Sequence, residues 1–167
     1  DVWAELFQIP YERPALDDAF ALRLEDYQCE NGGIVIANPN APTGIRQSEE
    51  FLRAVIEANP NVVVIIDEAY ADFSGYTALP LVDEYENVVV VQTFSKSRSM
   101  AGMRIGHAIG NAKLIKAMND VRYSFNSYPM TRLSVALGVA ALSDQDYFEE
   151  TTAKIVATRE RTKQALT

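Results

Sequence analysis

The sequence contains few of the residues that mark several classes of protein. Its one cysteine, Cys29, cannot form an intramolecular disulfide, and its one histidine, His107, offers with Cys29 neither a metal cluster nor a Ser-His-Asp triad. Acidic residues outnumber basic ones by 23 to 15, and the formal net charge of −8 disfavours nucleic acid as a partner. No apolar run approaches the roughly 18 residues of a membrane helix, and the first residues lack the basic region and apolar core of a signal peptide. We therefore expect a cytoplasmic protein without a nucleic-acid or membrane partner.

What the sequence does contain predicts one α/β domain with a mostly parallel sheet. The 167 residues, 48% of them hydrophobic, are enough for one core. Apolar runs predict strands at residues 34–37, 62–66, 88–91 and 106–110, and a less regular stretch predicts a short strand at 4–9. Residues 10–26 are expected to be loop, and 71–87 irregular or a short helix. Helices are predicted after Ser48, after Asn111, from Pro129 to Ser143 and from about Asp146. Strands that alternate with helices are typical of such a domain.

Three of the predicted strands end in polar residues. The strand at 34–37 leads into Asn-Pro-Asn-Ala-Pro-Thr-Gly at 38–44, in which two prolines and a glycine predict a rigid loop. The strand at 62–66 leads into Asp67-Glu68-Ala69-Tyr70, and the strand at 88–91 leads to Lys96 between two serines. Because ligands bind beyond the carboxyl ends of parallel strands, these groups are expected to meet at one edge of the sheet.

The side chains at this edge are those that a pyridoxal-phosphate site needs. Lys96 would bond to the cofactor aldehyde and later act as the base that moves the α-proton of the substrate. Asp67 would pair with the pyridine nitrogen, and Tyr70 would donate a hydrogen bond to the phenolate oxygen of the ring. An arginine and two hydroxyls would hold the phosphate: Arg104, Thr93 and Ser95.

These motifs resemble, in order and spacing, those of fold-type-I pyridoxal-phosphate aminotransferases, most closely the histidinol-phosphate aminotransferases. The resemblance rests on the motifs at 38–44 and 67–70, on Ser95-Lys96 followed by Ala-Gly-Met-Arg-Ile-Gly at 101–106, and on residues 121–129. It implies a three-layer α/β/α large domain, a parent homodimer, and transfer of an amino group from a donor such as histidinol phosphate to a 2-oxo acid, 2-oxoglutarate. It also implies the same roles for the site residues named above.

The chain departs from the family pattern in three respects. Many members carry asparagine directly before Pro-Thr-Gly, where this chain has Ala41, so the ring contact made there is either absent or supplied by Asn40. The amino-terminal part of the large domain and the carboxyl-terminal small domain, with its substrate-binding arginine, are also missing. We therefore expect residues 1–167 to be one domain, the central part of a large domain, and to be inactive alone.

Other interpretations remain open at this stage. Asp67-Glu68 after a strand also resembles the magnesium-binding strand of P-loop nucleotidases, but no Gly-x-x-x-x-Gly-Lys-Ser/Thr motif accompanies it. Lys96 alone would be read as a surface lysine, Arg104 as an ion-pair residue and Tyr70 as core, while the glycines at 102, 106 and 110 do not make a nicotinamide-binding turn. The functional alternatives are another fold-type-I enzyme, such as an aromatic aminotransferase or an amino-acid-phosphate decarboxylase, and a non-catalytic interaction or sensing domain, which Ala41 favours.

Overall fold

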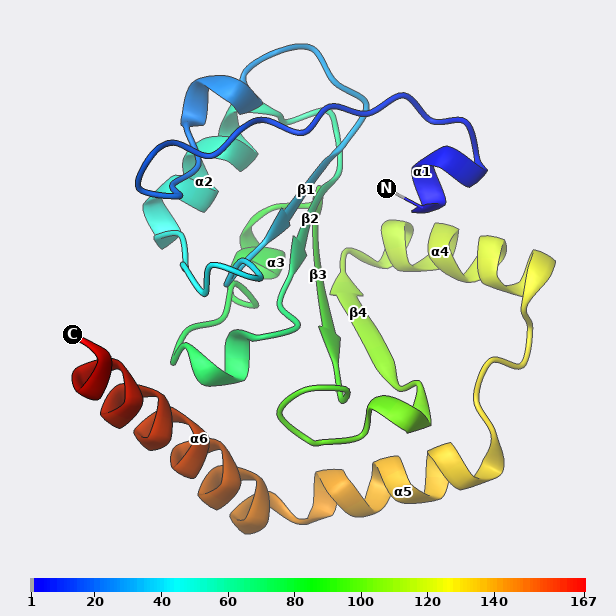
Figure 1. Ribbon diagram of the computed structural model, residues 1–167. Helices are drawn as coiled ribbons and strands as arrows, with labels where there is room; N and C mark the ends of the chain where they lie inside the picture. The colour runs from blue at the N-terminus through cyan, green and yellow to red at the C-terminus, as the bar shows by residue number, and fades with distance from the viewer. Residues whose placement is uncertain (1) are drawn as a thin grey trace.

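Four strands with helices around them form the structure, a computed structural model that describes residues 2–167 (Figure 1). The elements in chain order are α1 (Val2–Leu6), the 3-10 helix η1 (Leu24–Tyr27), β1 (Ile34–Ala37), α2 (Glu49–Ala58), β2 (Val64–Asp67), the 3-10 helix η2 (Ala71–Phe73), α3 (Leu81–Glu84), β3 (Val88–Thr93), the 3-10 helix η3 (Ala101–Met103), β4 (Gly106–Gly110), α4 (Ala112–Phe125), α5 (Arg132–Ser143) and α6 (Gln145–Leu166).

The strands lie in the order β1-β2-β3-β4. β1, β2 and β3 are parallel, with Ile36 opposite Ile66 and Ile66 opposite Val90. β4 runs antiparallel to β3, with Thr93 opposite Gly106, because the loop at 94–105 turns the chain back on itself. The prediction of an α/β domain with a mostly parallel sheet flanked by helices is confirmed.

The hydrophobic core lies on one face of this sheet, between β1–β3 and the helices α2 and α3. Side chains alternate between the faces of a strand, and the core takes every second residue of each: Ile34, Ile36, Val64, Ile66, Val88 and Val90. Leu52, Val55 and Ile56 of α2 and Leu81 of α3 cover them. The second face is more open at its β1 edge, where the Val35 side chain is 68% exposed, than at β3, where Val89 is 2% exposed.

Local sequence signals explain where α2 begins and ends. The hydroxyl of Ser48 accepts a hydrogen bond from the backbone N–H of Phe51, and Glu49 and Glu50 place negative charge at the positive end of the helix dipole. The helix ends at Ala58, with Asn59 as its C-cap and Pro60 directly after it. The predicted helix after Ser48 is confirmed.

One predicted element and two predicted boundaries are wrong. Residues 4–9 do not form a strand: α1 occupies Val2–Leu6, and the ring of Trp3 in α1 stacks on that of Phe7, directly after the helix, with the ring centroids 6.1 Å apart. The strand predicted at 62–66 is β2 at Val64–Asp67. The helix predicted from Pro129 begins at Arg132, because the Thr131 hydroxyl caps it by accepting a hydrogen bond from the N–H of Ser134.

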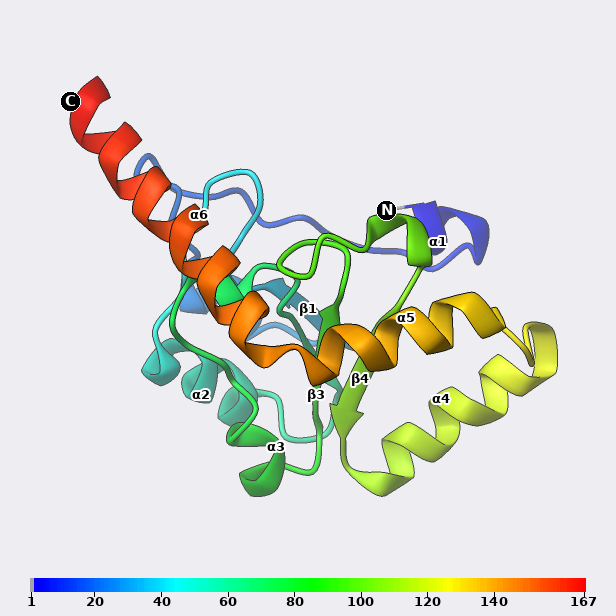
Figure 2. The same ribbon diagram turned by 90° about the horizontal axis from the view of Figure 1, so that it is seen from below.

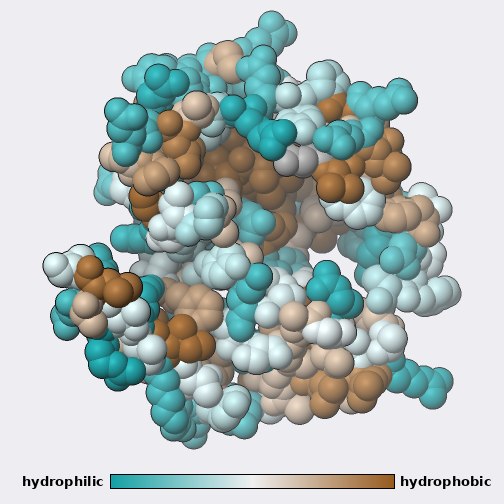
Figure 3. All heavy atoms as spheres, in the orientation of Figure 1, coloured by the Kyte–Doolittle hydropathy of each residue, from teal (hydrophilic) through white to brown (hydrophobic). Residues whose placement is uncertain are grey.

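The last two helices lie beside the carboxyl ends of β1, β2 and β3. Figures 1 and 2 show α5 and α6 crossing this end of the sheet, next to the loop that joins β3 to β4. Apolar side chains of α5 are exposed to solvent: Leu133, Val135, Leu137, Val139 and Leu142. Figure 3 shows hydrophobic surface, in brown, over α5 at the lower edge of the molecule. Within residues 2–167, no helix combines the length and the apolar character that crossing a membrane requires.

Candidate active site

Two of the predicted site residues lie on the second face of the sheet, where Asp67 is opposite Val91, two positions before Thr93. Asp67 ends β2 directly after Ile66, whose side chain belongs to the core, so alternation turns Asp67 to the opposite face. Thr93 ends β3 three positions after core residue Val90 and therefore shares that opposite face. Because β2 and β3 are neighbours in the sheet, a carboxylate and a hydroxyl stand together at its carboxyl-end edge.

The turn after β2 holds the Asp67 carboxylate. One of its oxygens, Oδ1, accepts a hydrogen bond of 2.9 Å from the N–H of Ala69, and the backbone carbonyl of Asp67 accepts one of 2.8 Å from the N–H of Asn38. In the described part of the chain, Oδ2 accepts no hydrogen bond. The partly exposed carboxylate is thus oriented by its own turn and keeps one oxygen for a ligand.

Lys96 and Tyr70 are brought together from different turns. The Lys96 ammonium lies 5.0 Å from the centroid of the Tyr70 ring, which attracts the cation through the negative face of its π-system. Tyr70 comes from the turn after β2, and Lys96 from the loop after β3. The Lys96 side chain is exposed and makes no hydrogen bond or ion pair within residues 2–167, so the amine is available to react.

The predicted phosphate-binding residues meet where β3 and β4 separate. The Thr93 hydroxyl lies 2.9 Å from the Ser95 hydroxyl and accepts a hydrogen bond from the N–H of Ser95. Phe94 donates a backbone hydrogen bond of 3.1 Å to the carbonyl of Ile105, which places the neighbouring Arg104 beside this turn. Arg104 has a left-handed backbone, with φ of 54°, and one Nη1 hydrogen bond of 2.9 Å to the Ala101 carbonyl. Its exposed guanidinium retains further donors for an anion.

In the loop after β1, the Asn40 side chain bonds within the loop itself. The Asn40 amide donates to the Thr43 hydroxyl at 2.8 Å, and the Asn40 carbonyl accepts from the N–H of Gly44 at 2.8 Å. The peptide bonds before Pro39 and Pro42 are both cis. Within residues 2–167, no hydrogen bond joins Asn40 to Lys96 or Tyr70, and Ala41 is exposed.

Several residues that support these turns were not singled out from the sequence. Ser97 is 4% exposed and its hydroxyl donates a hydrogen bond to the Asp72 carboxylate. Glu68, 3% exposed, accepts hydrogen bonds from the Thr77 hydroxyl, the Gln92 amide and the N–H of Ala78. The one sequence signal for the role of Glu68 is a charged residue directly after an apolar strand. Its hydrogen-bond partners lie 9 to 24 positions away in the sequence and could not be predicted from it.

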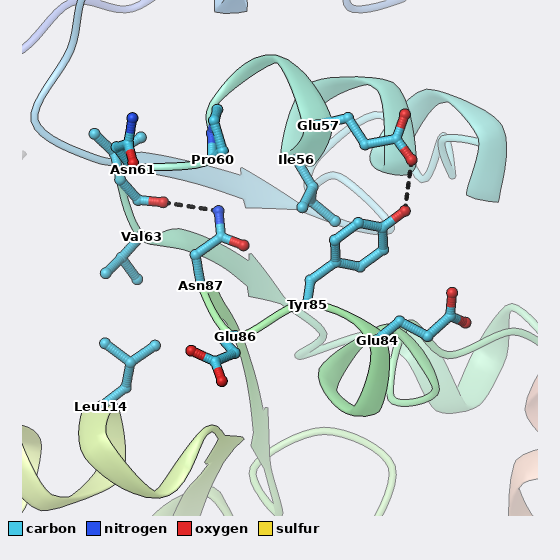
Figure 4. Close-up of a pocket in the computed structure, with 11 residues that line it drawn as sticks. Ile56, Glu57, Pro60, Asn61, Val63, Glu84, Tyr85, Glu86, Asn87 and Leu114 are labelled. Atoms are coloured by element: carbon cyan, nitrogen blue, oxygen red, sulfur yellow. Dashed lines mark hydrogen bonds between the residues drawn. The ribbon is translucent and has the colours of Figure 1, made fainter.

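A pocket at the other end of the sheet does not coincide with these residues. It measures about 570 Å³ and lies beside the amino ends of β2 and β3, with three glutamates, Glu57, Glu84 and Glu86, around its rim (Figure 4). The Tyr85 hydroxyl donates to Glu57 across it at 2.7 Å. None of the predicted site residues lines this pocket, so the candidate active site remains at the carboxyl ends.

A tyrosine near the carboxyl ends of the strands stays protonated over a wide pH range. Burial, followed by the negative charges of Glu49 and Glu68, raises the pKa of Tyr76 to about 12. The Arg46 guanidinium lies over its ring, 4.9 Å from the centroid, and opposes this shift. Tyr76 therefore acts there as a neutral packing residue.

Comparison with known proteins decides the family. A family model described as aminotransferase class I and II matches residues 3–167. The chain belongs to this family. It is 48% identical over 165 residues to the histidinol-phosphate aminotransferase of Lactococcus lactis subsp. cremoris, covering 99% of this chain and 46% of that protein. The resemblance to this family stated from the motifs is confirmed.

Two solved structures agree with this assignment. The histidinol-phosphate aminotransferase of Clostridium acetobutylicum superposes with a TM-score of 0.90 at 24% identity over 99% of this chain and 51% of that one, which establishes the fold. The Sinorhizobium meliloti enzyme of that name, in complex with pyridoxal 5'-phosphate, gives a TM-score of 0.70 at 32% identity over 78% of this chain and 36% of that one. The chain spans about half the length of the curated relatives it matches.

Proposed function

We propose that this chain is the central part of the large domain of a pyridoxal-phosphate-dependent aminotransferase. One observation carries the proposal: Lys96 lies over the Tyr70 ring, at the same edge of the sheet where Asp67 and Thr93 share a face. An amine, a phenol, a carboxylate and a hydroxyl from the ends of β2 and β3 and the turns that follow them thus gather beyond the carboxyl ends of parallel strands, where α/β proteins bind their ligands.

The donors and acceptors at this edge fit the cofactor. Pyridoxal phosphate, when bound, supplies an aldehyde that reacts with amines and a ring that withdraws electrons from the substrate. Oδ2 of Asp67, which accepts no hydrogen bond in the described residues, would accept one from a protonated ring nitrogen. The Tyr70 hydroxyl would donate a hydrogen bond to the oxygen on the ring. Three side chains are proposed to hold the phosphate: Thr93, Ser95 and Arg104.

The chain's own residues would then carry the proton transfers. Lys96 would supply the amine that links the cofactor to the protein, and its free amine would be the base that moves a proton at the substrate Cα. The Lys96 ammonium lies 5.0 Å from the centroid of the Tyr70 ring, so the two groups proposed to contact the cofactor are already neighbours. Asn40 is a weaker member of the proposed set, because its amide donates to Thr43.

The substrates follow from the relatives and belong to the proposal. Relatives at 47 to 51% identity are named histidinol-phosphate aminotransferases, which supports histidinol phosphate as the amino donor. We propose 2-oxoglutarate as the acceptor, a homodimeric parent protein that supplies the rest of the pocket, and a cytoplasmic location. The free, exposed Cys29 is compatible with a reducing compartment.

Trapping of the cofactor on the protein tests the proposal. The chain is mixed with pyridoxal phosphate, the link to any lysine is reduced with borohydride, and the labelled peptides are identified by mass spectrometry. We expect stoichiometric label on Lys96, and its loss in Asp67→Ala because the ring nitrogen then has no partner. Lys116→Met is the matched control, since Lys116 is an exposed lysine on α4 whose partner is Asp120. Label spread equally over exposed lysines would contradict the proposal.

A further inference from the structure

The loop that carries Lys96 is fastened to the helices below it by one arginine. Arg98 follows Lys96 by two residues, and its guanidinium carbon lies 4.0 Å from the centroid of the Phe148 ring and 5.4 Å from that of Phe94. Phe94 belongs to the loop itself, whereas Phe148 belongs to α6. A planar guanidinium can stack on aromatic rings in this way, and an ammonium cannot.

The same guanidinium also binds the end of α5. Its Nη1 donates a hydrogen bond of 2.7 Å to the carbonyl of Ala141, which lies in the last turn of that helix. The last four carbonyls of a helix have no partner within the helix and form the negative end of its dipole. Arg98 therefore caps α5 as well as packing against α6, and it links the Lys96 loop to the α5–α6 junction, residues 141–148.

Two further contacts hold α5 against this loop, and both are uncharged. In the described residues, Arg98 is the one charged side chain that links the loop to the α5–α6 junction. The Ser134 hydroxyl donates to the Met103 carbonyl at 2.9 Å. A Cβ added to Gly138 would lie 3.0 Å from Ile105 Cδ1, so the α5 backbone touches the loop there. Ser134 and Gly138 are the only residues of α5 that are buried.

We propose that Arg98 is a positioning residue for Lys96. On one side of Arg98, Ser97 is tied to the Asp72 carboxylate, and on the other, the N–H groups of Ser99 and Met100 bond back to the carbonyls of Lys96 and Phe94, each at 3.0 Å. Lys96, directly before Ser97, lies with its ammonium over the Tyr70 ring. When Arg98 is removed, the loop loses its attachment to the α5–α6 junction, and the amine is no longer held over the ring. The role assigned to Lys96 rests on the proposed function.

The first test measures the loop without any cofactor. Hydrogen–deuterium exchange of the peptide that covers residues 95–100 reports on the two amide hydrogen bonds of Ser99 and Met100. We expect exchange there to rise by about tenfold in Arg98→Ala and in Phe148→Leu, while exchange in β1–β3 is unchanged. Arg161→Ala is the matched control, because Arg161 bonds only to Thr158 of its own helix. Unchanged exchange in both test variants would overturn the proposal.

The second test measures the reactivity of Lys96 relative to another lysine in the same molecule. After trapping with pyridoxal phosphate and borohydride, the ratio of label on Lys96 to label on Lys116 is compared between variants. This ratio does not depend on how much protein is folded when unfolded chains are first removed by size exclusion. We expect it to fall by about tenfold in Arg98→Ala, and to be only partly restored in Arg98→Lys, which keeps the charge and loses the stacking.

The outcomes separate this inference from the function on which it rests. If wild-type protein takes no preferential label at Lys96, the proposed function fails, and with it the role for Arg98, whatever the exchange data show. If wild type is labelled at Lys96 and Arg98→Ala keeps the wild-type ratio, the function stands and Arg98 is a structural residue only. If Arg98→Ala does not fold, Phe148→Leu gives the same decision, since it removes one ring and leaves all charges in place.

Discussion

The two faces of the sheet use neighbouring residues of the same strands for different purposes. On the core face, Ile66 is fully buried against α2 and α3, and on the second face the next residue, Asp67, keeps a carboxylate oxygen for a ligand. The same division holds in β1, where Ile36 is buried and Val35 is exposed. In β1 and at the end of β2, the buried side chains therefore lie on one face and the candidate chemistry on the other.

This separation has a physical basis in the alternation of a strand. A change of one residue moves a side chain by the full thickness of the sheet, so a polar group can follow a buried isoleucine without entering the core. The buried face then fixes the backbone, and the fixed backbone orients Asp67 and Thr93 on the other side. The predictions below test this division, beginning with the largest effect.

The chain of 167 residues is expected to show no transamination of histidinol phosphate with 2-oxoglutarate. Its second face is exposed at Val35 and offers one side of a pocket, and loss of substrate positioning removes a large part of an enzyme's rate. Glutamate formation, followed in a coupled assay at high protein concentration, is the measurement. Turnover that disappears in Lys96→Ala would show that the chain is sufficient and that the prediction is wrong.

Truncation of β1 on its two faces should have very different effects on stability. Ile36→Ala leaves a cavity in the core and is expected to lower the free energy of unfolding by about 2–5 kcal/mol. Val35→Ala, one residue away, removes exposed methyl groups and should change it by no more than about 0.5 kcal/mol. Urea unfolding followed by circular dichroism measures both. Equal losses would mean that the second face is packed as tightly as the first.

Substitution of the adjacent carboxylates Asp67 and Glu68 should likewise affect different properties: stability for Glu68 and labelling of Lys96 for Asp67. Glu68→Gln turns an amide N–H₂ toward the donors on Thr77, Ala78 and Gln92, and leaving one buried donor unpaired costs about 1–3 kcal/mol. Asp67→Asn keeps the oxygen that accepts from Ala69, so stability should stay within about 0.5 kcal/mol. The Asn variant should instead lose the preferential label on Lys96. Thermal unfolding and label mapping on both variants give the comparison, and a stable Glu68→Gln protein would contradict it.

Much of the fold could be predicted because its signals are local. The run Val88–Val91 is β-branched and apolar as a strand buried on both faces must be, and the side chains of Ser48 and Asn111 cap their helices as predicted. Direction is not a local property: nothing in Gly106–Gly110 shows that β4 is antiparallel, because this depends on the path of the loop at 94–105. The sequence predicts a strand at 4–9 where the structure has the helix at Val2–Leu6, because five residues are too few to establish a helical period.

The site residues also differ in whether a local sequence signal could predict them. Lys96, Asp67, Tyr70 and Thr93 could be chosen because each follows an apolar strand or its turn, and the structure brings Lys96 to Tyr70. The residues that hold these turns could not be chosen. Arg98 reaches Phe148 fifty positions later, and Ser97 reaches Asp72 twenty-five positions earlier. Such contacts are made by the packing of whole elements and leave no periodic signal in the sequence.

The smallest predicted effect concerns the outer surface of the helices that cover the core face. Arg53 of α2 makes two hydrogen bonds, of 2.6 and 2.7 Å, with the Glu84 carboxylate of α3, and these bonds lower the pKa of Glu84 below its ordinary value of 4.5. A carboxylate whose pKa is lower in the folded state stabilises the protein above that ordinary value and loses this contribution as the pH falls through the folded pKa. Glu84→Gln should therefore be slightly less stable than wild type at pH 7, and the difference should vanish in acid and shrink in 1 M salt. Urea midpoints across pH 2.5–7, with Glu86→Gln as the control for loss of a neighbouring charge, provide the measurement. A difference in stability that persists at pH 2.5 would show that the Glu84 side chain stabilises the contact between α2 and α3 through packing and not through its charge.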